Sequence, residues 1–122
     1  GHNVDGIKYV CGHLDFLHQK FNQELHIVFG MVNDKDISSV LQELPKDATY
    51  YFTKASVKRA LPENELLALA EEAGLKGTTY PTVVEAVQAA KKNCPPKDLI
   101  FVGGSSFIVA DLLANRDTLN LY

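Results

Sequence analysis

The 122-residue sequence lacks several features that mark particular classes of protein. It has no apolar run approaching the ~18 residues that a membrane-spanning helix needs, and no charged and then apolar leader opens it. Only two cysteines are present, Cys11 and Cys94, and they form no CxxC motif. Because secreted domains of this size usually carry more cysteines, we expect free buried thiols and a cytoplasmic location.

Positive charge is also scarce. Lysine and arginine number 12 against 15 aspartates and glutamates, which leaves a formal net charge of −3. This balance gives no electrostatic reason to expect nucleic acid or an anionic membrane as a partner. The composition, 46% hydrophobic and 22% charged, is typical of a globular protein, and the length suffices for one domain with its own core.

Apolar spacing alternates along the chain between the periods of helices and strands. Residues 7–21 place apolar side chains every three or four positions, which predicts a helix that Asn3 caps. Further helices are predicted over residues 37–44, 62–74, 82–92 and 105–113. Buried strands are predicted over 25–30, 48–53 and 98–104, with a short edge strand over 77–80. The helix over 105–113 is so apolar that it should be buried on most sides, and the tail after it should pack loosely.

This alternation predicts an α/β, Rossmann-like domain with a mostly parallel sheet and helices on both faces. It also calls for a strand before the first helix, whereas Gly1 stands immediately before the residues that cap that helix. We therefore expect a fragment of a larger protein. Where the missing strand would lie, we expect an altered sheet edge or pairing with a second copy.

The segments that follow the predicted strands should share one edge of the sheet, where open α/β sheets bind their ligands. They are residues 30–36, 53–62, 79–82 and 103–106, and two of them carry the stronger candidate groups. GGSS (103–106) opens a helix after a buried strand and suits a carboxylate or phosphate, although Ser105 could simply cap that helix. NDKD (33–36) places Lys35 where it could hold a substrate carboxylate, although a solvated turn is the simpler interpretation.

Other candidate motifs are weaker. Lys54, Lys58 and Arg59 form a small basic group that is either a solvated loop or a site for phosphate or carboxylate. His13 and His18 are five residues apart, the wrong spacing for a metal site on one helix face. The sequence has neither a full GxGxxG motif nor a GxxxxGK[ST] loop, so it cannot be claimed to bind nucleotide phosphates by itself.

Four segments together resemble the C-terminal domain of folylpolyglutamate synthase, a family within the Mur ligase superfamily whose bacterial members are often also dihydrofolate synthases. They are HNVDGI (2–7), FGMVNDKDI (29–37), YYFTKASVKRAL (50–61) and FVGGSSFIVADLL (101–113). Val4 replaces the proline that is common in the first segment. The segments span nearly the whole chain, so the resemblance implies one Mur ligase-type C-terminal domain over residues 1–122, excised from a larger enzyme.

The resemblance also implies a reaction. In this family ATP phosphorylates a carboxylate of dihydropteroate or folate, and the amino group of L-glutamate attacks the acyl phosphate while Mg²⁺ neutralises charge. By motif, His2, Lys35 and Ser105 would bind the incoming glutamate, and Asn3 and Asp34 would lie near the ATP or the glutamate. The P-loop and most metal ligands would belong to an N-terminal domain of the same parent chain, so this domain should be inactive alone.

Two other interpretations remain open. The chain could be the matching domain of a muramyl-peptide ligase, or a stand-alone Rossmann-like binding module without chemistry. The TKAS…RAL and GGSSF segments favour the folate branch. Sequence upstream of Gly1 would discriminate between these classes, because a ligase would carry a strand ending in aspartate and a GxxxxGK[ST] loop further back.

Overall fold

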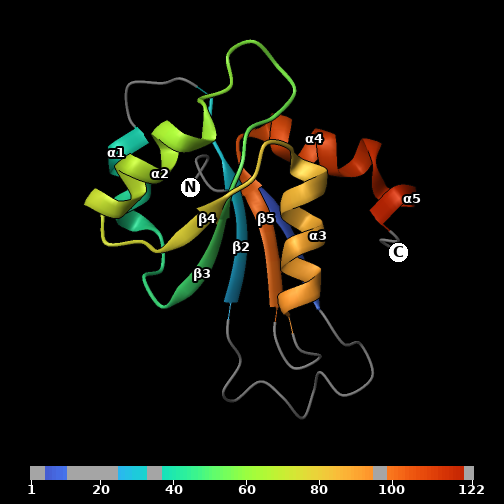
Figure 1. Ribbon diagram of the computed structural model, residues 1–122, viewed down its shortest axis with the longest axis horizontal. Helices are drawn as coiled ribbons and strands as arrows, with labels where there is room; N and C mark the ends of the chain where they lie inside the picture. Colours follow the sequence, from blue (N-terminus) through green and yellow to red (C-terminus); the bar gives the residue numbers. More distant parts are fainter. Residues whose placement is uncertain (1–4, 11–24, 33–36, 95–98, 120–122) are drawn as a thin grey trace.

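The computed structural model describes residues 5–10, 25–32, 37–94 and 99–119 (Figure 1). Its strands are β1 (Asp5–Val10), β2 (Leu25–Gly30), β3 (Ala48–Phe52), β4 (Gly77–Thr79) and β5 (Leu99–Gly104). Its helices are α1 (Ile37–Glu43), α2 (Glu63–Glu72), α3 (Val83–Asn93), α4 (Ser106–Ala114) and α5 (Arg116–Leu119). The strands form one sheet in the order β1-β5-β2-β3-β4, in which only β1 runs antiparallel to its neighbour. The predicted α/β architecture is confirmed.

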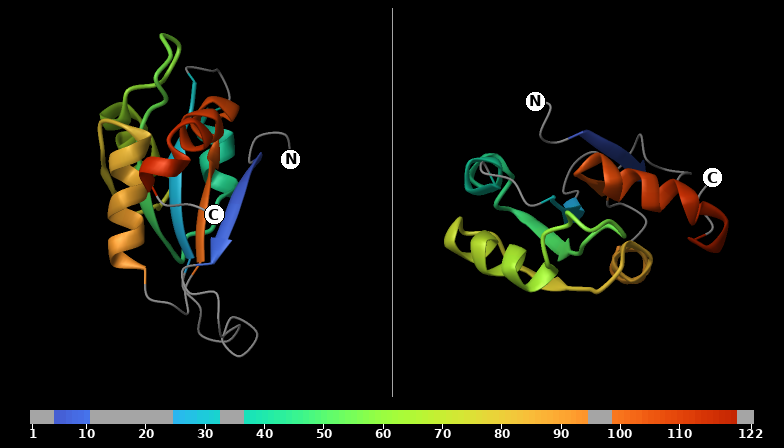
Figure 2. Two further views of the ribbon diagram at one scale, coloured as in Figure 1. Left: turned by 90° about the vertical axis from the view of Figure 1, so that its right-hand side faces the viewer. Right: turned by 90° about the horizontal axis from the view of Figure 1, so that it is seen from above.

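The two faces of the sheet bury alternate residues of each strand, as the period of a strand requires. One cluster joins the β2 and β3 side chains of Ile27, Phe29, Tyr50 and Phe52 to α1 and α2. The other joins Val28, Tyr51, Ile100 and Val102 to α3 and α4. Seen from above, α1 and α2 accordingly lie on one side of the sheet and α3 and α4 on the other (Figure 2).

Local sequence signals explain where the later helices begin and end. The Thr82 hydroxyl accepts a hydrogen bond from the Glu85 backbone N–H (3.2 Å), and it donates to the Glu85 carboxylate (3.3 Å), as in a capping box. Gly74 follows α2 with a φ of +86°, the conformation in which glycine ends helices most easily. Pro62 stands immediately before α2, where its missing N–H costs no helical hydrogen bond.

Two buried tyrosines of β3 anchor the middle of the sheet. The Tyr50 hydroxyl donates to the Pro45 carbonyl (2.5 Å), and burial raises the pKa of this phenol well above its usual value of 10.0. Tyr51 shares a hydrogen bond with His26 Nδ1 (2.9 Å). Burial raises the pKa of Tyr51 as well, against the opposing effect of a hydrogen bond from Asn93.

The start of the chain differs from the prediction. Residues 5–10 form β1 rather than the first turns of a helix, and each pairs with a residue of β5, from Asp5 with Gly104 to Val10 with Leu99. The reason is that β5 would otherwise present an open edge, and a strand beside it satisfies those backbone groups. The edge beside β5 is thus occupied by β1, while the rest of the predicted helix lies outside the described residues.

Three further expectations need correction. The helix α4 is less covered than its composition predicted, because Phe107 is 40% exposed and Leu113 is 48% exposed. Part of the tail, Arg116–Leu119, is the short helix α5 rather than a loose segment. Cys94, predicted to be a free thiol, is disulfide-bonded, and the only other cysteine of the chain, Cys11, lies outside the described residues.

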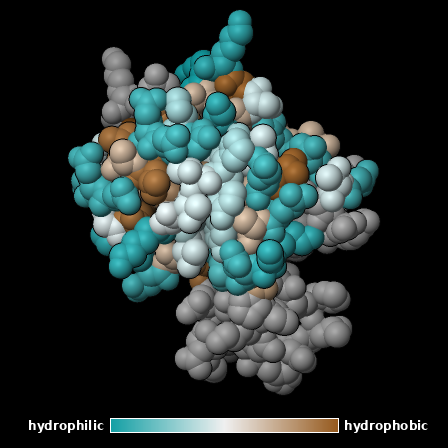
Figure 3. Space-filling view, viewed as in Figure 1, coloured by the Kyte–Doolittle hydropathy of each residue, from teal (hydrophilic) through white to brown (hydrophobic). Residues whose placement is uncertain are grey.

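The surface seen in Figure 1 is mostly hydrophilic, and its hydrophobic residues form separate small spots (Figure 3). The projection at the top of this view, where Figure 1 draws the loop after β3, is hydrophilic as well. In the part of the chain that the structure describes, every helix is too short or too polar to cross a membrane.

Candidate functional site

The carboxyl end of β2 organises the candidate site. Three successive carbonyl groups of this strand end accept hydrogen bonds from three different segments of backbone. Phe29 accepts from Thr53 N–H (2.9 Å), Gly30 from Ser105 N–H (2.9 Å) and Met31 from Leu61 N–H (2.8 Å). The start and end of the loop after β3 and the start of α4 are therefore fixed around one point, as predicted for the polar loops at this edge of the sheet.

Ser105 connects β5 to α4 and is the N-cap of that helix. Its hydroxyl oxygen accepts a hydrogen bond from Phe107 N–H (3.1 Å), and its backbone is extended, with φ −76° and ψ 144°. The capping role considered for Ser105 is thus observed. It does not exclude binding, because a hydroxyl that accepts one hydrogen bond can still donate its own proton to a ligand oxygen.

Gly104 lets the chain turn tightly before Ser105. Its φ is +104°, a conformation that residues with a side chain rarely adopt. A Cβ at this position would overlap the Gly30 carbonyl oxygen and would also lie 3.0 Å from Cε1 of the Phe29 ring. The GGSS segment therefore needs glycine here to bring the start of α4 against the end of β2.

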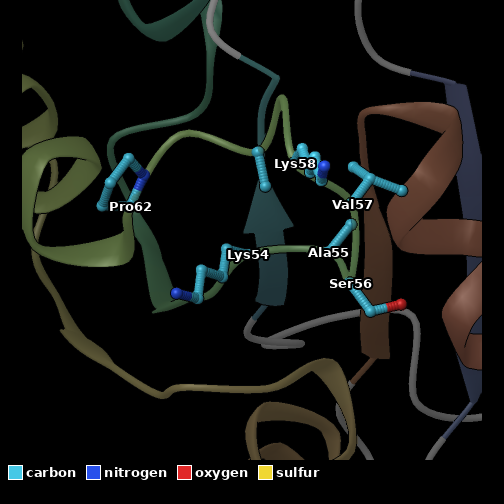
Figure 4. A pocket seen from close by; sticks show the side chains of 7 residues that line it. Lys54, Ala55, Ser56, Val57, Lys58 and Pro62 are labelled. Carbon is cyan, nitrogen blue, oxygen red and sulfur yellow. The ribbon is translucent and has the colours of Figure 1, made fainter.

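The loop over residues 53–62 forms a second wall of this edge. Its middle is tied to α4, because Asp111 accepts hydrogen bonds from the Ser56 backbone N–H (2.8 Å) and from the Ser56 hydroxyl (2.9 Å). Its end pairs with the residues after β2 through a bridge between Ala60 and Val32. The loop encloses a hollow of about 520 Å³, lined by residues 54–58, Ala60 and Pro62 (Figure 4).

The first residue of that loop carries an unusual buried hydroxyl. Thr53 is 0% exposed, and its Oγ1 has no hydrogen-bond partner among the residues that the structure describes. Burying a hydroxyl without a partner costs about 1–3 kcal/mol. The buried hydroxyl of Thr53 therefore lowers the stability of the fold, and an apolar side chain would pack at this position without that cost.

Of the five residues that the family resemblance assigns to glutamate or ATP, the structure describes only Ser105. Ser105 lies at the carboxyl edge of the sheet, as expected. His2 and Asn3 lie outside the described residues, and so do Asp34 and Lys35. Whether these four meet Ser105 stays a prediction.

Sequence reasoning missed the contact between Ser56 and Asp111, whose residues are 55 positions apart and carry no local motif. Residues 5–10, 25–32, 37–94 and 99–119 contain no group of three His, Cys, Asp or Glu suited to a metal.

Comparison with known proteins identifies the same family as the motifs. Residues 1–106 match the model of the Mur ligase, glutamate ligase domain. The chain is 31% identical over 124 residues to a dihydrofolate synthase/folylpolyglutamate synthase of Buchnera aphidicola, a match that covers 99% of this chain and 28% of the relative.

Solved structures agree in fold. E. coli FolC in complex with DHPP and ADP superimposes with a TM-score of 0.72 at 24% identity, covering 86% of this chain and 25% of that one. A bifunctional folylpolyglutamate synthase/dihydrofolate synthase with Mn, AMPPNP and L-glutamate bound gives a TM-score of 0.61 at 21% identity, covering 80% of this chain and 24% of that one. The chain thus corresponds to about a quarter of the length of these proteins.

Proposed function

This chain belongs to the Mur ligase family and matches its glutamate ligase domain. From that premise we propose that the chain is part of an ATP-dependent enzyme that adds L-glutamate to dihydropteroate or folate. The observation that carries the proposal is Ser105. It lies at the start of a helix on the carboxyl edge of a parallel sheet, within the segment GGSSF that the family resemblance assigns to glutamate. A hydroxyl and a helix N-terminus together suit a carboxylate.

The proposed reaction balances as two displacements. A carboxylate oxygen of the acceptor attacks the γ-phosphorus of ATP, which forms an acyl phosphate and releases ADP. The amino nitrogen of L-glutamate then attacks the acyl carbon, and the tetrahedral intermediate expels inorganic phosphate while the nitrogen loses a proton. The products are one amide bond, ADP and phosphate.

In this mechanism the domain orients the amino acid. Ser105 would donate its hydroxyl proton to a carboxylate oxygen of the incoming glutamate, while its oxygen keeps the bond from Phe107 N–H. Lys35 and His2 would supply further donors to that carboxylate. Binding the carboxylate in this way holds the amino group of the glutamate toward the acyl phosphate. The attack then proceeds from a bound, oriented pair instead of a random collision of two molecules.

ATP and Mg²⁺ would be held mainly by the rest of the longer protein. The described residues include no group suited to a metal ion, and the sequence has no GxxxxGK[ST] loop. A relative is known with Mn and AMPPNP bound, which supports the same type of cofactors here. Asn3 and Asp34 would contribute part of the ATP site, and Mg²⁺ would neutralise charge on the phosphates.

The folate branch is the better supported of the ligase alternatives. A relative that matches nearly the whole chain is a dihydrofolate synthase/folylpolyglutamate synthase, and one of the structural neighbours described above is a bifunctional folylpolyglutamate synthase/dihydrofolate synthase. A non-catalytic module and a muramyl-peptide ligase have no comparable support. We infer a cytoplasmic location from the need for ATP, although the disulfide at Cys94 is unusual for a reducing compartment.

A chimera tests the proposal. In it this chain replaces the corresponding C-terminal quarter of the E. coli enzyme, and the readout is glutamate-dependent release of ADP with dihydropteroate, a folate or a muramyl peptide as acceptor. We expect activity with the first two acceptors and none with the muramyl peptide. The 122-residue chain alone should release no ADP. A folded chimera without glutamate-dependent turnover, beside an active E. coli parent, would refute the proposal.

A substitution of Ser105 separates binding from helix capping. Ser105→Asp keeps a good N-cap but replaces the hydroxyl donor by a negative charge facing the glutamate carboxylate. In the chimera we expect the KM for glutamate to rise roughly tenfold or more, with the KM for ATP little changed. Ser39→Ala, at an exposed position of α1, is the control and should leave both values unchanged.

A further inference from the structure

The loop over residues 53–62 carries positive charge that the reaction proposed above does not use. Lys54, Lys58 and Arg59 lie within six residues of each other, and all three are exposed in a chain whose net charge is −3. Within the described part of the chain, none of the three makes a hydrogen bond or an ion pair. These cations are therefore available to a ligand.

This loop is held in place rather than left free. Both of its ends are bonded to carbonyl groups at the carboxyl end of β2, Thr53 N–H to Phe29 and Leu61 N–H to Met31. Its middle is bonded twice to Asp111 of α4 through Ser56. A ligand that binds here would lose less affinity to ordering of the loop than it would on a flexible segment.

The hollow beside the loop is large enough for a small ligand and has cations on its wall. Its volume of about 520 Å³ falls within the usual range of ~300–1,000 Å³ for ligand pockets. Figure 4 shows Lys54 and Lys58 on two arms of the loop, with Pro62 and Ser56 on opposite sides of the hollow. Two ammonium groups on separate arms suit a ligand with more than one anionic group.

The hollow lies beside the proposed glutamate site. Asp111, which binds Ser56, comes six residues after Ser105 on the same helix, about 9 Å along its axis. In a γ-linked glutamate tail each residue keeps a free α-carboxylate, and the terminal residue also has a free γ-carboxylate. Such a tail presents several negative charges close to the point where the next glutamate is added.

We propose that residues 53–62 form a subsite for the carboxylates of an oligoglutamate tail. Its cations are Lys54 and Lys58, which line the hollow, together with the exposed Arg59 next to them in the loop. The proposal rests on the function proposed above, since it assigns the tail of that enzyme's acceptor. It implies that the domain binds an acceptor with several glutamates more tightly than one with a single glutamate, and that the difference falls as salt screens the charges.

The experiment measures the affinity of the 122-residue chain for γ-linked triglutamate by isothermal titration calorimetry at two salt concentrations. The test variant carries K54Q, K58Q and R59Q. The control carries K46Q, K76Q and K92Q, which make the same change in net charge at exposed lysines near the opposite edge of the sheet. Circular dichroism confirms that both variants are folded. We expect roughly a tenfold loss of affinity in the test variant and less than about twofold in the control.

Each alternative result overturns the subsite. Equal losses of affinity in the two variants would indicate an effect of net charge alone. If the wild-type chain does not bind triglutamate, an oligoglutamate tail is excluded as the ligand. Displacement of triglutamate by ADP or inorganic phosphate would make the loop a phosphate site instead. The two proposals can be refuted independently. A chimera without ligase activity would refute the proposed function but would leave triglutamate binding by this chain unaffected. Loss of the subsite would leave the addition of glutamate to dihydropteroate intact.

Discussion

Replacing Gly104 by alanine should destabilise the fold by about 3–6 kcal/mol, most of it through the contact between the start of α4 and β2. A residue with a side chain at positive φ costs about 1–2 kcal/mol, and the φ of Gly104 is +104°. The added Cβ would also overlap the Gly30 carbonyl oxygen. Since that atom belongs to backbone, relieving the overlap costs a further ~1–3 kcal/mol, as overpacking typically does.

The overlap has a second consequence. The Gly30 carbonyl accepts the hydrogen bond from Ser105 N–H (2.9 Å), so moving it weakens a bond worth about 1 kcal/mol. Domains of this kind are stable by only ~5–15 kcal/mol in total. The substitution therefore removes a large share of the stability and displaces Ser105 at the same time.

Gly74→Ala is the matched control. Its φ of +86° imposes a similar backbone cost, but an added Cβ there would meet only the Lys46 side chain, at 3.6 Å. We expect a loss of about 1–2 kcal/mol for this variant. Urea unfolding of both variants, followed by far-UV circular dichroism, gives the two values. Equal losses would show that the overlap with Gly30 contributes nothing and would refute the reasoning.

Two further predictions concern the tyrosines of β3 and the link between Ser56 and Asp111. Burial raises the pKa of Tyr50 and of Tyr51 above the unfolded value of 10.0, so their contribution to stability is complete below that pH and is lost as the pH rises through the folded values. The urea concentration at the midpoint of unfolding should decrease as the pH rises above about 10, and it should decrease less steeply in Tyr50→Phe. A midpoint that does not change at alkaline pH would contradict this. Asp111→Ala removes both bonds to Ser56 and should cost about 1–2 kcal/mol and speed proteolysis within residues 53–62, whereas Asp47→Ala should do neither.

The sequence predicts the buried strands well because each is an apolar run bounded by turn residues. The run over residues 25–30 coincides with β2, and those over 48–53 and 98–104 match β3 and β5 to within one residue. Capping chemistry is equally local, so Thr82 and Glu85 mark the start of α3 correctly. These signals depend only on residues that are close together in the sequence, so a single sequence is enough to identify them.

The failures all depend on contacts that are distant in sequence. The segment over residues 5–10 fits a helix by its spacing, and only the open edge of β5 selects a strand there. The exposure of Phe107 depends on what covers α4, which composition does not reveal. The bonds between Ser56 and Asp111 join residues 55 positions apart, and no motif announces them.

Backbone hydrogen bonds hold the loops of the candidate site in place. Thr53 and Leu61 belong to the loop after β3, and Ser105 precedes α4, yet each donates its backbone N–H to one of the carbonyl groups of residues 29–31 at the end of β2. Backbone bonds of this kind do not depend on which side chains the loops carry. The loops can therefore vary in their chemistry while the frame that positions them stays fixed.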